Sequence, residues 1–126
     1  MRTRNFRDDE FTCRCRHCNL SVPQPGLVVP ELMIALQQAR DILQAPITVT
    51  SGRRCVRHNR KVGGVRNSYH CSGRAVDVKA DNMNALYDAL VAVPTFRYIE
   101  RHDSYIHADV GMVRTVRCVD KRGEAR

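Results

Sequence analysis

Two short segments in which apolar and polar residues alternate constrain the fold of this chain more than any other feature. They read Ala75-Val-Asp-Val-Lys79 and Tyr105-Ile-His-Ala-Asp-Val110. A period of two predicts β-strands whose successive side chains point to opposite faces of a sheet. If the two strands lie close together in one sheet, their apolar faces are covered by helices. Asp77 and His107 then lie together on the polar face, with Asp109 on the same side.

The rest of the pattern predicts an α+β fold. Apolar residues at helical spacing predict a helix over Pro30–Leu43, which can begin at its proline, and a second helix runs from a cap at Asp81 to about Val91. β-branched residues predict two more strands, at 47–51 and 95–100. Residues 52–69 are rich in glycine and arginine and are expected to form a loop. We therefore expect a small antiparallel sheet of about four strands packed against two helices.

The chain of 126 residues has the length of one domain, 1–126. Residues 1–27 form a cysteine-rich arm that we expect to be irregular, and residues 117–126 form a charged tail that we expect to be frayed. No segment is long and apolar enough to span a bilayer, and the charged N-terminus lacks the apolar centre of a signal peptide. We expect a monomer that is made in the cytoplasm and has no membrane partner.

The net charge of +8 favours polyanionic partners, such as nucleic acid or the anionic bacterial cell wall. The chain has no tryptophan, few aromatic residues and no recognisable nucleic-acid-binding signature. We therefore expect no nucleic-acid partner.

Asp77 and His107 together with His70, from the loop before the first strand, offer two imidazoles and one carboxylate. Three such ligands suit a catalytic zinc ion, which keeps one coordination position open. Other interpretations remain for each residue alone. Asp77 could pair with an arginine, because a buried carboxylate needs a partner, and His107 could be a hydrogen-bonded structural residue.

The residues around these ligands form a longer pattern. Ser68, His70, Gly73, Ala75 and Asp77 stand in the order Ser-x-His-x-x-Gly-x-Ala-x-Asp, followed by a later His-x-Asp. This pattern resembles the zinc D-alanyl-D-alanine carboxypeptidase family of peptidoglycan metallopeptidases, which includes phage endolysins. The resemblance covers roughly residues 29–112, including the run Thr50-Ser-Gly-Arg-Arg54. It implies that His70, Asp77 and His107 are zinc ligands.

The same resemblance implies roles for further residues. Arg54 would contact the substrate and take part in catalysis, because a guanidinium suits a carboxylate or an oxyanion. Arg53 or Arg57 could take this role instead, and Arg54 could be a solvated surface charge. Ser68 would bind substrate. Some members of the family have a glutamate where this chain has Ser104. Others have a histidine at the position of His102, so we expect His102 to be the acid–base group, with Glu100 and Asp103 as the next candidates. Asp109 would orient a ligand histidine.

These assignments imply a zinc-dependent peptidase that acts on peptidoglycan stem peptides, as a carboxypeptidase or an endopeptidase. A phage or prophage endolysin, or a wall hydrolase of a virion, would reach the wall of a bacterial host after release by another factor. The alternative is a non-catalytic wall-binding or tail module that keeps the fold of the metal site. Ser104 in place of a glutamate is the feature that supports this alternative.

Six cysteines raise a separate question. Three of them, Cys13, Cys15 and Cys18, form a Cys-x-Cys-x-x-Cys cluster. This cluster could hold a second, structural zinc ion, with the fourth ligand taken from Cys118, Cys55, Cys71 or His17. Disulfides formed outside the cell and thiols without a bond remain as alternatives.

Overall fold

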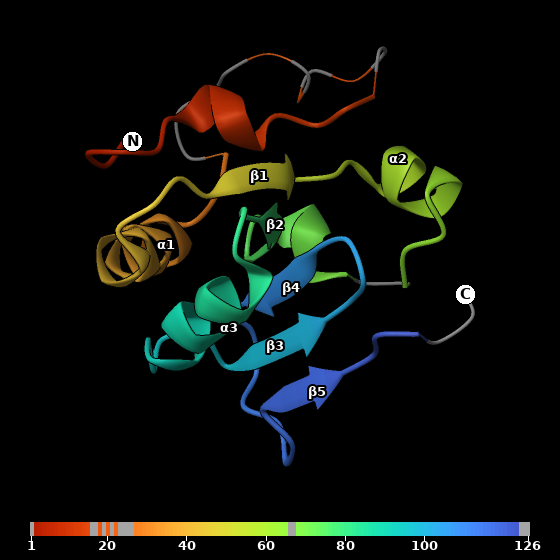
Figure 1. The fold of residues 1–126 in the computed structure, drawn as a ribbon. Helices are drawn as coiled ribbons and strands as arrows, with labels where there is room; N and C mark the ends of the chain where they lie inside the picture. The colour runs from red at the N-terminus through yellow and green to blue at the C-terminus, as the bar shows by residue number, and fades with distance from the viewer. Residues whose placement is uncertain are drawn as a thin grey trace.

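The computed structural model describes residues 2–15, 18, 20, 22, 27–65 and 68–123. Within them the chain forms an open, mixed five-stranded sheet in the order β1-β2-β4-β3-β5. The strands are β1 (Thr48–Ser51), β2 (Ala75–Lys79), β3 (Tyr98–Arg101), β4 (Ile106–Asp109) and β5 (Cys118–Asp120) (Figure 1). The first four are antiparallel to their neighbours, and β5 runs parallel to β3. The α+β class is thus confirmed, with one strand more than expected.

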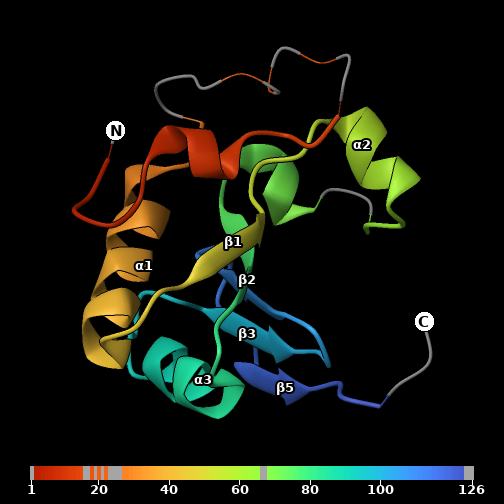
Figure 2. The ribbon, with the colours of Figure 1, turned by 45° about the horizontal axis from the view of Figure 1, so that its top comes forward.

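Helices α1 (Pro30–Leu43) and α3 (Met83–Val91) contact each other and cover the apolar face of the sheet (Figures 1 and 2). Pro30 lies at the first helical turn of α1, where its missing N–H costs nothing. The cap of α3 is Asn82 and not Asp81 as expected: the Asn82 side chain accepts a bond from the Ala85 N–H at 3.0 Å. Both helices end within a residue or two of the positions that the sequence predicts. None of the helices in the described part of the chain is long and apolar enough to cross a bilayer.

The faces of the sheet separate apolar from polar side chains, as the alternation predicts. The apolar face is fully buried under the helices and includes Val76, Val78, Ile99, Ile106 and Ala108. On the other face, neighbouring strands pair Ser51 with Asp77, Asp77 with His107 and His107 with Glu100. These four residues form one row across β1, β2, β4 and β3, which we call the transverse row. The row places the polar side chains of four strands on one line.

Two elements differ from the sequence expectation. Residues 118–120, expected to be part of a frayed tail, form β5 beside β3. The Arg117 guanidinium fixes the start of this strand by donating to three carbonyls, those of Phe96, Val91 and Val93, at 2.8 to 3.0 Å. Residues 56–61, expected to be loop, form the short helix α2 (Val56–Lys61). A helix of this length presents too few turns to produce a periodic pattern.

The N-terminal arm is more ordered in its described part than the sequence suggests. It contains a 3-10 helix, Asp8–Phe11, and buries Phe6 and Phe11 in the core. The arm lies against the start of the loop that follows β1 (Figure 2). The Arg53 N–H donates to the Phe11 carbonyl at 3.0 Å, and a Cβ atom added at Gly52 would lie 2.5 Å from the Phe11 Cα. Only glycine allows this close approach of the two backbones.

Candidate metal centre and active site

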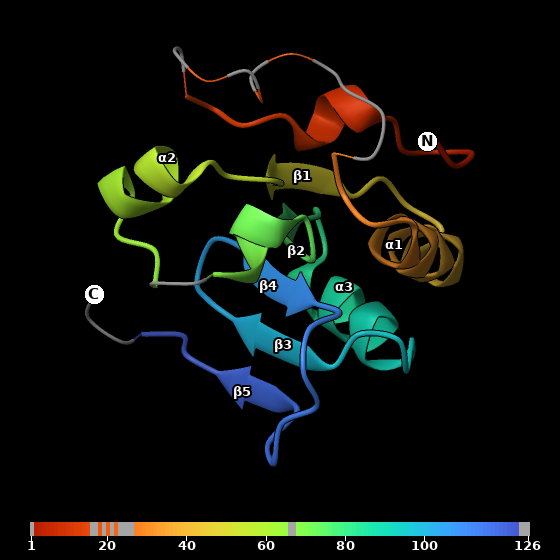
Figure 3. The same cartoon turned by 180° about the vertical axis from the view of Figure 1, so that it is seen from behind.

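Three side chains converge on the polar face of the sheet. Asp77 and His107 are directly paired on β2 and β4, and His70 comes from the 3-10 helix Tyr69–Ser72, which lies beside β2 (Figure 3). The Asp77 Oδ1 lies 3.1 Å from the His70 Nε2 and 3.2 Å from the His107 Nδ1. One ligand atom from each residue lies within 4.8 Å of the other two. The structure therefore brings together the three residues that the sequence suggests as ligands.

Each of the three also has a partner on its far side. The His70 Nδ1–H donates to the Gly52 carbonyl at 2.8 Å, and the His107 Nε2–H donates to the Asp109 Oδ2 at 2.8 Å. The Arg54 Nη2 donates to the Asp77 Oδ2 at 2.9 Å. Such partners fix the tautomer and orientation of metal-bound side chains. They leave the His70 Nε2, the His107 Nδ1 and the Asp77 Oδ1 facing one another.

This donor set fits a catalytic zinc ion. It supplies two imidazole nitrogens and one carboxylate oxygen, without a thiolate, and three protein ligands leave a position for water or substrate. His70 and Asp77 are buried, and His107 is partly exposed. A metal held here would therefore be reached from one side only, the side of the cavity described below.

In the absence of a metal, opposite charges hold His107 and Asp77 together. Burial would lower the pKa of His107, but hydrogen bonds to Asp109 and Asp77 outweigh it and raise the pKa to about 9. Burial would raise the pKa of Asp77, but hydrogen bonds from His107 and His70 hold it well below its usual range. At neutral pH the metal-free group is thus a carboxylate beside an imidazolium, and a metal ion must displace the proton from His107.

A cavity of about 320 Å³ opens over the three ligands. His102 and Glu100 line it beside them and form a bonded pair: the His102 Nε2 lies 2.5 Å from the Glu100 Oε1. The Tyr98 hydroxyl donates to the other carboxylate oxygen at 2.6 Å, and the His102 ring stacks on Tyr105. Burial would raise the pKa of Glu100, but these bonds outweigh it and lower the pKa. Glu100 is therefore an ionised acceptor that fixes the His102 ring.

The other residues suggested by the sequence lie in or near this cavity. Arg54 lines it but is largely occupied, because it also donates to the Ser51 Oγ at 3.0 Å and to Asn59 at 3.2 Å. Ser68 lines the cavity too, and its hydroxyl accepts a bond from the His70 N–H at 3.1 Å. Asp109 is fully buried behind His107.

The candidates for an acid–base group separate in the structure. His102 and Glu100 lie in the cavity wall, whereas Asp103 and Ser104 are exposed in the turn between β3 and β4. Asp103 accepts a bond from the Gly123 N–H, so it links the turn to the segment that follows β5.

Tyr98 and Arg114 are among the residues of the cavity wall that sequence reasoning missed. Tyr98 could have been found, because it lies two residues before Glu100 in a strand and so shares its face. Arg114 comes after the last strand of the motif, and no spacing rule indicates it. Its guanidinium lies 3.8 Å from the centre of the Tyr98 ring and 3.5 Å from the Asp109 Oδ2.

The cysteines do not join this centre. Cys13, Cys18 and Cys55 form a group of their own, which among the described residues includes neither Cys15 nor Cys118. Cys118 lies in β5, on the far edge of the sheet. His17, the other suggested ligand, lies outside the described residues.

Comparison with known proteins agrees with this geometry. No curated protein matches the chain. The family model described as Peptidase M15 matches residues 4–109, which span the N-terminal arm, all three candidate ligands and Asp109. This match confirms the resemblance to the zinc D-alanyl-D-alanine carboxypeptidase family. The chain belongs to the Peptidase M15 family of metallopeptidases.

Proposed function

We propose that the protein is a zinc-dependent peptidase that hydrolyses peptide bonds in the stem peptides of bacterial peptidoglycan. The observation that carries this proposal is the convergence of His70, Asp77 and His107 at the floor of an open cavity whose wall holds a histidine–glutamate pair. The family match supports the reaction class. The positive charge of +8 suits an anionic wall as the surface on which the protein works.

Bound zinc would polarise the scissile carbonyl and lower the pKa of a water molecule at its open position. His102 serves as the acid–base residue in this proposal. Its Nε2–H is held by the ionised Glu100, so the Nδ1 is the nitrogen left to take up a proton and deliver it to the leaving amine. The stacked Tyr105 ring keeps the imidazole in plane.

Two arginines would position the substrate. Arg54 uses three of its five N–H donors on Ser51, Asn59 and Asp77, so its remaining donors are available to a substrate oxygen. Arg114 has a side chain that is 39% exposed at the wall of the cavity, where it can pair with a peptide carboxylate. A free terminal carboxylate is present in the substrate of a carboxypeptidase and absent at an internal cross-bridge. Arg114 therefore favours removal of a terminal residue.

We further propose that the protein acts as a monomer in the lysis of a bacterial host, as a phage or prophage endolysin or as a wall hydrolase of a virion. The family match, together with a net charge of +8 that suits an anionic wall, supports an enzyme that works on the wall.

Digestion of purified murein tests the reaction. Mass spectrometry of the soluble fragments should show loss of terminal residues or cut cross-bridges with the zinc-loaded protein and neither with a His107→Ala variant. Arg114→Met should raise KM by about tenfold for stem peptides with a free carboxylate while leaving kcat near its original value. Cleavage confined to the glycan, or binding to murein without release of any peptide fragment, would overturn the proposal and favour a non-catalytic wall-binding module.

A further inference from the structure

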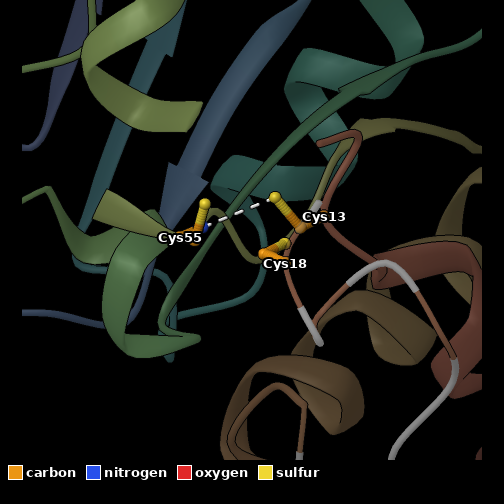
Figure 4. A group of neighbouring side chains, drawn as sticks. All are labelled: Cys13, Cys18 and Cys55. Carbon is orange, nitrogen blue, oxygen red and sulfur yellow. Dashed lines mark hydrogen bonds between the residues drawn. The ribbon is translucent and has the colours of Figure 1, made fainter. Parts of the chain in front are cut away.

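A second group of potential metal ligands lies away from the candidate active site. The sulfur atoms of Cys13, Cys18 and Cys55 all lie within 4.8 Å of one another (Figure 4). Cys13 and Cys18 belong to the N-terminal arm, and Cys55 follows the loop after β1. The contact therefore joins parts of the chain that are about forty residues apart in sequence. The proposed peptidase chemistry does not use these three thiols.

Backbone N–H groups point at two of the three sulfurs. Burial and the neighbouring thiols nevertheless raise the pKa of Cys55 to about 11, so a metal ion must displace its proton. The Cys55 N–H points at the Cys13 sulfur at 3.5 Å, and the His58 N–H points at the Cys55 sulfur at 3.3 Å. Hydrogen bonds from backbone N–H groups to ligand atoms are a regular feature of metal sites, where they orient the ligand and stabilise its charge. The Cys13 side chain is buried, with 3% of its surface exposed. A metal bound here would be shielded from solvent on the side of the core.

The spacing also suits one ion better than it suits disulfides. Sulfurs that bind one tetrahedral zinc at about 2.3 Å lie roughly 3.8 Å apart, which is within the span of this group. Four residues separate Cys13 from Cys18, and paired ligands of structural zinc sites are commonly two to four residues apart. A disulfide can use only two of three neighbouring thiols. All six cysteines lie in the described part of the chain, and the structure joins no two of them by a disulfide.

We propose that Cys13, Cys18 and Cys55 supply three of the four ligands of a structural zinc ion, a site that we call the thiolate clasp. The clasp fastens the N-terminal arm to the loop that runs from Gly52 to Cys55. Next to it, the Arg53 N–H donates to the Phe11 carbonyl at 3.0 Å, so the arm and the loop already lie in contact. The clasp stabilises this contact by adding metal–ligand bonds between the two segments.

The loop that the clasp holds also supports the candidate active site. The Gly52 carbonyl accepts the bond from His70, and Arg54 donates to Asp77. Gly52 and Arg54, which hold the ligands His70 and Asp77, thus lie within three residues of Cys55. The clasp thereby acts as a positioning element for the catalytic centre, although its three sulfurs contact neither the substrate cavity nor the three ligands. This inference does not depend on which bond the enzyme cleaves.

Cobalt substitution of the full chain, purified under reducing conditions, tests the proposal. Of the two groups of ligands only the clasp contains sulfur, so a near-ultraviolet sulfur-to-cobalt charge-transfer band reports on the clasp and not on the histidine–aspartate centre. We expect the band and two metal ions per wild-type chain, measured by elemental analysis. Cys13→Ser and Cys55→Ser should each lose the band and one ion. The matched control, Cys118→Ser, should keep both ions and the band.

A second variant separates the clasp from the proposed function. His107→Ala should lose one ion and the peptidase activity but keep the charge-transfer band, whatever the substrate proves to be. The wild-type spectrum alone can overturn the proposal, so the test does not depend on whether a serine variant folds. A wild-type chain with one ion and no sulfur band would refute the clasp. A disulfide among the three cysteines in the reduced, metal-loaded protein, detected by alkylation and mass spectrometry, would refute it equally.

Discussion

Replacement of Asp109 by asparagine offers a direct test of the electrostatics at the metal centre. Asp109 is fully buried, and its Oδ2 accepts the His107 Nε2–H at 2.8 Å. The asparagine side chain has nearly the same shape and can still accept this bond through its amide oxygen, but it carries no charge. Its amide nitrogen then faces the Gly111 N–H, so the bond that Gly111 donates to the other carboxylate oxygen at 3.1 Å is lost. The variant therefore removes the negative charge behind His107 with little change in packing.

The expected magnitude follows from the pKa of His107. In the metal-free protein the pKa is raised to about 9 by the hydrogen bonds and charges of Asp109 and Asp77, against the effect of burial. A close opposite charge typically moves a pKa by about 1 to 3 units. Loss of Asp109 should thus bring the pKa of His107 from about 9 to about 7, a change of about 2.7 kcal/mol. Asp77 still contributes its share in the variant.

Nuclear magnetic resonance titration of the metal-free protein measures this pKa directly, and His107→Gln assigns the signal. Zinc binding gives a second measurement, because the metal displaces the proton from His107. At pH 8 His107 is about 0.9 protonated in the original protein and about 0.1 protonated in the variant. Calorimetry in buffers of different ionisation enthalpy should therefore show about 0.8 fewer protons released per chain in Asp109→Asn.

Protons released elsewhere in the chain, including those from cysteine thiols, are common to both proteins and cancel in this difference. Zinc affinity measured above pH 9, where His107 is deprotonated in both proteins, should fall by about ten- to a hundredfold, because an orienting partner of a ligand is weakened. At pH 8 the lower pKa of His107 in the variant offsets this fall by about tenfold. An unchanged pKa of His107 in the variant, or equal proton release in the two proteins, would refute the assignment of Asp109 as the residue that sets the charge of His107.

Three further predictions follow from the same structure. His102→Ala should lower kcat on stem peptides by about 100- to 10,000-fold while the zinc content stays unchanged, and equal turnover would remove His102 from the mechanism. Gly52→Ala should destabilise the fold by about 1 to 3 kcal/mol in urea unfolding, because its Cβ would lie 2.5 Å from the Phe11 Cα. It should also weaken zinc binding, since the Gly52 carbonyl holds His70; a variant of normal stability and zinc content would contradict the close packing of the arm. With a chelator present, protonated His107 should stabilise the metal-free chain below pH 6.5. About 3 kcal/mol of this stability should be lost as the pH rises to 9, because the pKa of His107 is raised in the folded state. His107→Gln should lack this loss, and equal pH profiles for the two proteins would count against a protonated His107.

The sequence predicts those parts of the structure that depend on local pattern. The alternation in β2 and β4 was enough to place Asp77 and His107 on one face, because side-chain direction in a strand has a strict period of two. The start of α1 was predictable from Pro30, whose ring suits the first turn of a helix. The placement of His70 came from the longer motif, since a loop residue has no period of its own.

The parts of the structure that the sequence does not predict depend on contacts between residues that are distant along the chain. The three residues of β5 become a strand only through parallel pairing with β3 and the bonds of Arg117, which no local signal encodes. Arg114 reaches the cavity because the chain returns over Tyr98 after the last strand of the motif. Cys55 joins Cys13 across about forty residues, whereas spacing rules find only neighbours such as Cys13 and Cys18. Tertiary contacts decide all three cases.

Because the transverse row pairs Asp77 with His107, metal binding at these residues depends on the correct register of β4 against β2. A slip of β4 by one residue would turn its apolar side chains to solvent, so the hydrophobic effect forbids it. A slip by two residues leaves every apolar side chain on the helix side and places Tyr105 or Asp109 opposite Asp77. Burial distinguishes this pairing from the native one only weakly. Only the native pairing brings the three ligands together. Zinc binding would therefore stabilise the correctly assembled sheet relative to the slipped one during folding.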